Sequence, residues 1–250
     1  MPAAGPMSAH RSGWTHCPGS STQDAEPRAY PVATMPPPPS PSLRDGFPDP
    51  LSTIGGFAAG PDGDGAVRAA SVLLDATTLD VLAGELVCLP AAGTGTSDTH
   101  ASREQAALLA ALEALPHAPD LALVHGHGIA HPQGMGIAAR FGVAAGLPSI
   151  GVARSLLYGT GPEPHETRGA YTALRDPTRR QLGWLLRSRP GHPPLVVSPG
   201  HRVALASAAD LVMRFTRGDR LPEPLRLADR LVRGGDPEES DGTKLRAPKT

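Results

Sequence analysis

Three histidines lie in a short glycine-rich stretch near the middle of the chain, LALVHGHGIAHPQG at residues 121–134. They are His125, His127 and His131. Neutral imidazole binds transition metals, so one interpretation is a histidine-based metal site. However, side chains at i, i+2 and i+6 of such a loop share no enforced face, unlike a histidine pair at i and i+4 of a helix. The alternative is a scaffold loop whose glycines let backbone N–H groups approach a ligand closely.

The elements around this loop predict how it is positioned. The apolar run at 120–124 is typical of a buried central strand. Further strands are expected at 52–60, in a hairpin at 66–89, and at 148–153, 168–174, 181–188 and 193–198. Helices are expected at 102–116, 135–146, 201–216 and 222–232. This order predicts an α/β domain whose mixed sheet begins with an antiparallel hairpin and continues with parallel strands flanked by helices.

Composition divides the chain into three parts. Residues 1–50 are rich in Pro, Ser and Gly and are predicted to be disordered, with Met35 a candidate natural start. Residues 51–233 form the predicted domain, and 234–250 a polar tail. The net charge of −1 gives no global basic excess, although a local basic patch is compatible with it. Neither a membrane span nor a signal peptide is apparent, so the cytoplasm is the expected location.

Several stretches resemble, in order, the endonuclease V family. They are LVHGHGIAHPQGMGIAARFGVAAGLPSIGVARSLL at 123–157, GWLLRS at 183–188, SPGHRVAL at 198–205 and TRGDRLPEPLRLADRLV at 216–232. The resemblance runs from about residue 54 to 232, most of the predicted domain. It implies an RNase H-like fold and Mg²⁺-dependent cleavage of DNA or RNA near inosine. Inosine-containing DNA or RNA is then the expected partner, with no membrane partner.

Hydrolysis of a phosphodiester by Mg²⁺ needs hard oxygen ligands, usually two or three carboxylates. The resemblance places these at the first strand, on the first long helix and at the end of the central strand. The three positions hold Ala58, Glu104 and His125 in this chain. Alanine offers no ligand, and imidazole is a poor ligand for Mg²⁺. The metal site implied by the resemblance is therefore degenerate, with only Glu104 and His125 left as candidate ligands.

The resemblance also implies roles for residues outside the carboxylate set. Arg154 takes the place of a lysine; it can clamp a phosphate but cannot act as an acid or base near neutral pH. His201 stands where the family has an assisting histidine. Gly126, Gly128 and His131 match the loop that lines the pocket for a flipped base. Glu104 and His201 also have structural interpretations, as a residue that favours a helix dipole and as a residue before a helix.

The aromatic wedge loop of the family is replaced by a longer segment without aromatic residues, at 89–102. We therefore expect a divergent endonuclease V homologue that binds nucleic acid and whose catalysis is weak or lost. The alternative from another class is a non-catalytic interaction module on the same scaffold. A third hypothesis is an enzyme with relocated ligands, either Glu104 and His125 with a transition metal or Asp62 and Asp64 in place of the missing carboxylates.

Overall fold

A computed structural model of the chain describes residues 40–62, 65–91 and 100–234. The predicted tail, most of the predicted N-terminal segment and most of the wedge-loop replacement lie outside these residues. The strands are β1 (Thr53–Pro61), β2 (Val67–Asp75), β3 (Val81–Leu89), β4 (Leu121–His125), β5 (Ser149–Ala153), β6 (Tyr171–Arg175), β7 (Gln181–Leu186) and β8 (Leu195–His201). They form one sheet in the order β3-β2-β1-β4-β5-β8-β7-β6.

The sheet is mixed, which confirms the predicted fold class. β1, β2 and β3 are antiparallel neighbours, and β1, β4 and β5 pair in parallel at its centre. Beyond β5, the strands β8, β7 and β6 are antiparallel again. The parallel part is thus shorter than the sequence suggests, because β6, β7 and β8 follow one another through short hairpin-like connections rather than helical crossovers.

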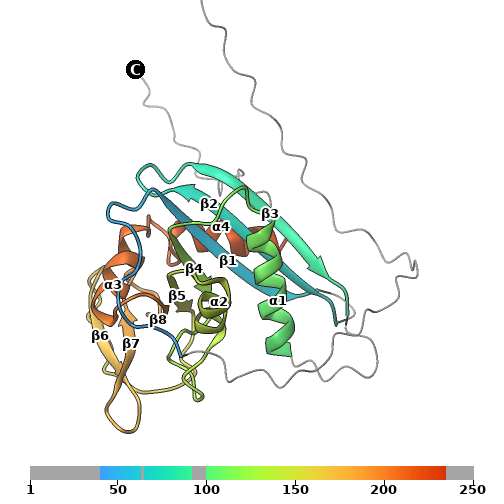
Figure 1. Cartoon of the computed structure of the whole chain (residues 1–250). Helices are drawn as coiled ribbons and strands as arrows, with labels where there is room; N and C mark the ends of the chain where they lie inside the picture. Colours follow the sequence, from blue (N-terminus) through green and yellow to red (C-terminus); the bar gives the residue numbers. More distant parts are fainter. Residues whose placement is uncertain (1–39, 63–64, 92–99, 235–250) are drawn as a thin grey trace, which may run out of the picture.

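Helices cover both faces of the sheet. α1 (His100–Glu113) and α2 (Ile137–Ala145) lie on one face, and α3 (Leu205–Arg214) and α4 (Glu223–Val232) on the other. Figure 1 shows α1 and α4 on opposite sides of the β1–β3 strands. Among the described residues, no helix has the length and apolar character that crossing a membrane requires.

Side chains of the central strands alternate between these two faces, as the pleat requires. On β1, Phe57 packs in the core under α1 and α2, where its ring lies 4.8 Å from that of Phe141. The next residue, Ala58, packs in the opposite core with Ala228 of α4. On β4, Val124 belongs to the α1/α2 face. Alternation therefore directs the side chains of Ala58 and His125 to the α4 face.

A segment before β1 is part of the folded unit. The backbone N–H of Ala204 donates to Asp45 Oδ1 at 2.7 Å, and the Ser207 hydroxyl donates to Asp45 Oδ2 at 2.6 Å. Because α3 has no cap from its own preceding side chain, Asp45 supplies the missing acceptor from a distant part of the chain. The folded unit thus begins before the boundary expected after residue 50.

Candidate functional site

Three of the predicted positions meet at one edge of the sheet. Phe57 of β1 is level with Val124 of β4, so the following residues, Ala58 and His125, are neighbours on adjacent strands. His125 is level in turn with Val152 of β5, two residues before Arg154. The carboxyl ends of parallel strands converge on the same edge, which is the usual place for a ligand in such sheets. The structure brings Ala58, His125 and Arg154 together there.

A carboxylate that the sequence analysis did not single out lies among them. Asp229 of α4 accepts a hydrogen bond from Arg154 Nη2 at 2.7 Å, and its other oxygen lies 3.5 Å from His125 Nδ1. Arg233, one turn further along the helix, places Nη2 3.2 Å from Asp229 Oδ2. The side chain of Asp229 is only 16% exposed. Two arginines and a histidine thus surround one half-buried carboxylate.

The protonation state of Asp229 follows from these contacts. Burial acts to raise the pKa of this carboxyl, but the hydrogen bond from His125 and the charge of Arg154 act against it, and the net effect lowers the pKa of Asp229 below its ordinary value. The positive charges of His125 and Arg233 act in the same direction. Asp229 is therefore an anion at neutral pH, held by its cationic neighbours.

Arg154 is fixed from its backbone as well as from its side chain. Arg220 donates from Nη2 to the carbonyl of Arg154 at 2.7 Å and also contacts the carbonyls of Pro193 and Pro194. Partial burial lowers the pKa of Arg220, and the charge of Arg154 adds to this effect. Arginine has so high an ordinary pKa that the guanidinium stays charged. The edge of the sheet consequently holds Arg154 and Arg233 against one carboxylate, with Arg220 beside the backbone of Arg154.

A cavity of about 260 Å³ lies next to this edge, between α1 and the loop after β4. Glu104, Gly126, His127 and His131 line it together with Arg140. Glu104 thus lines a cavity shared with the loop after β4. Burial lowers the pKa of His127, whose Nε2 lies 3.1 Å from the Ser155 carbonyl oxygen. This cavity collects the predicted residues Glu104, Gly126 and His131.

The glycines of the loop do not offer their N–H groups to a ligand, which corrects that expectation. The N–H of Gly126 donates to the Val152 carbonyl at 3.0 Å, and that of Gly128 donates to the Ser198 hydroxyl at 2.8 Å. What requires glycine is space. A Cβ on Gly128 would lie 2.0 Å from the Pro199 carbonyl oxygen. The two glycines serve the packing of the loop onto β5 and β8, although Gly126 still borders the cavity.

His201 is placed away from the other predicted catalytic residues. It ends β8, which runs antiparallel to β5, so His201 is level with Ser149 at the beginning of β5. Its Nδ1 accepts a hydrogen bond from the Ser42 backbone at 3.2 Å, and burial lowers its pKa. His201 therefore lies at the opposite end of β5 from Arg154, and its assisting role stays a prediction. The sequence pattern could not reveal this, because the direction of β8 is a property of the topology.

The residues at the sheet edge do not fit a divalent metal. Ala58 has no donor atom, Oδ1 of Asp229 contacts His125, and Oδ2 contacts the guanidinium groups of Arg154 and Arg233. Within the described ranges, no group of three or more His, Cys, Asp or Glu side chains is arranged to hold a metal ion. Asp62 pairs with Arg68 at 2.9 Å, and Asp64 lies outside the described residues. The family generally uses a divalent metal, and this donor set departs from that requirement.

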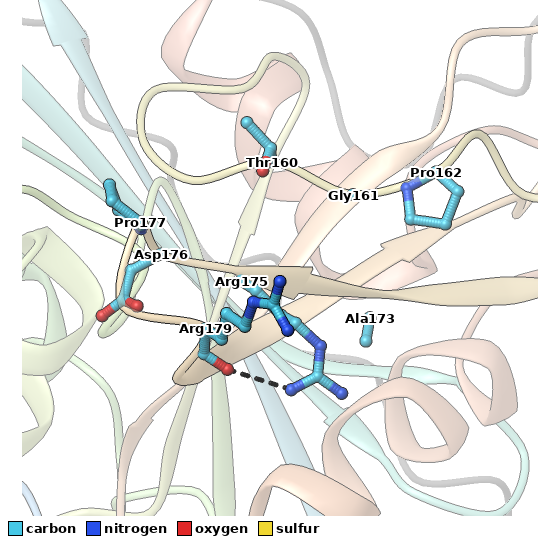
Figure 2. A pocket seen from close by; sticks show the side chains of 8 residues that line it. All are labelled: Thr160, Gly161, Pro162, Ala173, Arg175, Asp176, Pro177 and Arg179. Atoms are coloured by element: carbon cyan, nitrogen blue, oxygen red, sulfur yellow. Dashed lines mark hydrogen bonds between the residues drawn. The ribbon is translucent and has the colours of Figure 1, made fainter.

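A larger groove of about 870 Å³ opens at the other end of the sheet (Figure 2). Its lining includes Thr160, Arg175 and Arg179, and Figure 2 shows the hydrogen bond from Arg175 to the backbone carbonyl of Arg179. Arg175 is level with Gln181, the first residue of β7 and thus at the same end of the sheet as the beginning of β5. The groove contains none of the predicted site residues, so its size does not make it the candidate site.

Comparison with known proteins places the chain in a family. The sequence profile of endonuclease V matches residues 41–230. The chain is 51% identical to endonuclease V of Azotobacter vinelandii over 191 residues, which is 76% of this chain and 86% of that protein. The profile match thus includes every described strand and helix except the last two residues of α4.

Solved structures agree with the sequence comparison. Endonuclease V from Streptomyces avermitilis superposes with a TM-score of 0.70 at 36% identity, covering 78% of this chain and 86% of the other. Endonuclease V from Ciona intestinalis, in complex with a 24mer DNA containing an inosine followed by a ribo-adenosine, gives a TM-score of 0.66 at 23% identity, covering 77% and 90%. At that identity the second likeness supports the fold alone. The mixed α/β sheet expected from the sequence is thus confirmed, and its fold is similar to that of solved endonuclease V structures.

Proposed function

Because the chain belongs to the endonuclease V family, we propose that it binds inosine-containing DNA or RNA while its metal-dependent hydrolysis of phosphodiesters is weak or lost. The observation that carries the proposal is the contact of Asp229 with His125 and Arg154 at the edge of the sheet. In an RNase H-like nuclease this edge must concentrate negative charge to attract metal ions. Here it concentrates positive charge.

Support for nucleic-acid binding comes from the cavity beside Glu104 and from Arg154. The loop that lines the cavity is packed tightly, as a preformed binding site requires. Arg154 directly follows β5, the neighbour of β4 in the sheet, and carries the planar fork that suits phosphate oxygens. The Ciona relative was solved with inosine-containing DNA, which makes the same class of ligand the first to test. We keep the cytoplasm as the proposed location.

A cleavage and binding assay tests both halves of the proposal. The full chain is incubated with end-labelled single- and double-stranded DNA and RNA that carry one inosine, and with otherwise identical strands that carry adenosine instead. Mg²⁺ and Mn²⁺ are supplied in separate reactions. We expect binding that prefers inosine, with little or no cleavage in either metal.

Glu104→Ala and Glu113→Ala are the matched variants for this assay. Both glutamates lie on α1, but Glu113 is exposed at the last residue of the helix, whereas Glu104 lines the cavity. Cleavage by the wild type that Glu104→Ala abolishes and Glu113→Ala preserves would show an active nuclease and refute the loss of catalysis. A chain that binds none of the strands would favour the interaction module on the same scaffold.

A further inference from the structure

We propose that arginine side chains take the place of the metal in this chain, so that the edge of the sheet holds a backbone phosphate without any divalent ion. The inference rests on the proposed function, since it takes nucleic acid as the ligand. It concerns how the ligand is held: a guanidinium clamp formed by Arg154 with Arg220 and Arg233, and Asp229 as its internal counter-ion.

The charge count at this edge favours an anion. Arg154 and Arg233 both pair with Asp229, and among the described residues neither has another carboxylate partner. Arg220 directs its guanidinium to backbone carbonyl oxygens and pairs with no described carboxylate. Two guanidinium groups therefore contact one carboxylate, and a third, that of Arg220, lies beside the backbone of Arg154. Together the three arginines carry three positive charges against the one negative charge of Asp229.

Asp229 keeps the clamp formed while no ligand is bound. Its contact with Arg154 orders a long side chain that is still 37% exposed and thus accessible from solvent. A phosphate presents oxygens that a guanidinium fork can bind in the same way as a carboxylate. An arriving backbone phosphate can therefore share or take over the guanidinium groups that now contact Asp229.

A divalent cation meets the opposite situation. To bind Oδ2 of Asp229 it must displace two guanidinium groups, and to bind Oδ1 it must displace His125 and remain close to both guanidinium groups. Either position meets Coulomb repulsion that increases in a half-buried site. Ala58 supplies no ligand to offset this cost. The same contacts that favour a phosphate thus disfavour a metal ion. The binding of nucleic acid at this edge should therefore not depend on a bound metal ion.

Fluorescence anisotropy with a labelled single-stranded inosine oligonucleotide tests the proposal. The affinity of the wild-type chain is measured in EDTA and in Mg²⁺ or Ca²⁺ at matched ionic strength. We expect the Kd to change by no more than about twofold, because counterion competition is then the only effect of the metal. An affinity that rises about tenfold with metal would overturn the inference.

Variants separate the clamp from a general effect of charge. Arg154→Ala should weaken binding and reduce the slope of log K against log salt by about one, as expected for the loss of one phosphate contact. Arg175→Ala removes the same charge from an exposed position at the other end of the sheet and should change neither quantity appreciably. Equal losses of affinity in the two variants would refute the clamp, and so would an Arg154→Ala variant whose affinity equals that of the wild type.

Asp229→Asn gives the sharpest contrast because the two alternatives predict opposite signs. If Asp229 is a counter-ion, removing its charge should tighten oligonucleotide binding several-fold in EDTA. If it were a metal ligand, the variant should lose any stimulation by metal without gaining affinity in EDTA. Circular dichroism and thermal unfolding show whether the variant is folded, and Arg154→Lys, which keeps the positive charge, gives a second folded control that should retain part of the affinity.

The outcomes distinguish this inference from the function on which it rests. A wild-type chain that binds no oligonucleotide in any condition would overturn both. A wild-type chain that binds inosine strands only with metal would overturn the clamp and leave the proposed ligand in place. Binding that is independent of metal and weakened by Arg154→Ala would support the two together.

Discussion

Two neighbouring regions of the molecule are held by different means. The loop after β4 is fixed through its backbone: Gly128 donates to Ser198 and accepts from Gly136, and neither glycine has room for a Cβ. The edge around Asp229 is fixed through side-chain charges. The tightly packed glycines tolerate almost no larger residue, whereas the charged side chains can be exchanged while the backbone of the sheet stays unchanged. This difference explains how Ala58 and His125 can stand where carboxylates are expected while the family fold persists.

The largest effect should follow from breaking the backbone-held region. Gly128→Ala would place a Cβ 2.0 Å from the Pro199 carbonyl oxygen, where only main-chain movement can relieve the clash. We expect the free energy of unfolding to fall by roughly 3 kcal/mol or more, measured by urea denaturation. Gly218→Ala is the control, because nothing lies within 4 Å of its added Cβ and no positive φ is recorded there. Equal stability of the two variants would contradict the comparison.

Carboxylates can be restored at the edge of the sheet around Asp229. In the double variant Ala58→Asp with His125→Asp, a charge enters a position that is 1% exposed, so without metal the fold should lose about 2 kcal/mol or more. If the backbone around the site is intact, Mg²⁺ or Mn²⁺ should raise the melting temperature of the double variant and not that of the wild type. Inosine-dependent cleavage should then appear in the assay described above. A folded double variant whose melting temperature does not respond to metal would mean that the backbone around the site has diverged as well.

The pH dependence of stability should also differ between the regions. Burial lowers the pKa of His127 in the folded chain below its ordinary value of about 6.5, and the charges of His131 and His125 act in the same direction. The unfolded chain therefore takes up the proton first, so the contribution of His127 is complete above pH 6.5 and is lost as the pH falls below it. His127→Asn should flatten the decline in stability between pH 7 and pH 5. Urea midpoints at several pH values measure this, and an unchanged slope would contradict it.

The smallest effect is expected at the rim of the Asp229 cluster. Arg233 is 65% exposed, so its ion pair with Asp229 is screened by solvent. Arg233→Ala should change the free energy of unfolding by less than about 0.5 kcal/mol, again by urea denaturation. Arg154→Ala, which removes a more buried and shorter contact with the same carboxylate, should cost more. A larger loss for Arg233 than for Arg154 would show that the cluster is organised differently.

The sequence predicts the elements of this fold well because their signals are local. The apolar run before His125 and the leucine spacing of α1 both appear within single elements, and the structure confirms the strand and the helix. The direction of β8 is not local, and for this reason the sequence does not predict that His201 lies at the opposite end of β5 from Arg154. Strand direction depends on which connection returns across the sheet, and single-residue patterns do not encode it.

The site was predicted only in part. The resemblance to the family identified Ala58, His125 and Arg154, and the sheet register brings these three together. Asp229 was missed because it was regarded as part of an amphipathic helix. A signal was present: Asp229 lies directly between buried Ala228 and the half-buried Arg230, beside the apolar face of α4 rather than opposite to it. A carboxylate at that position requires a partner, and Arg154 is the partner that the fold supplies.

The cap that Asp45 places on α3 has a consequence for the order in which the chain assembles. Asp45 is separated by 159 positions from Ala204 and by 162 positions from Ser207. The contact therefore forms only after the intervening sheet has brought these residues together. We therefore expect α3 to acquire this hydrogen-bond acceptor late in folding, when the segment at Ser42 to Gly46 contacts the beginning of the helix. Proteolysis that removes this segment should leave the central sheet folded and should destabilise α3 first.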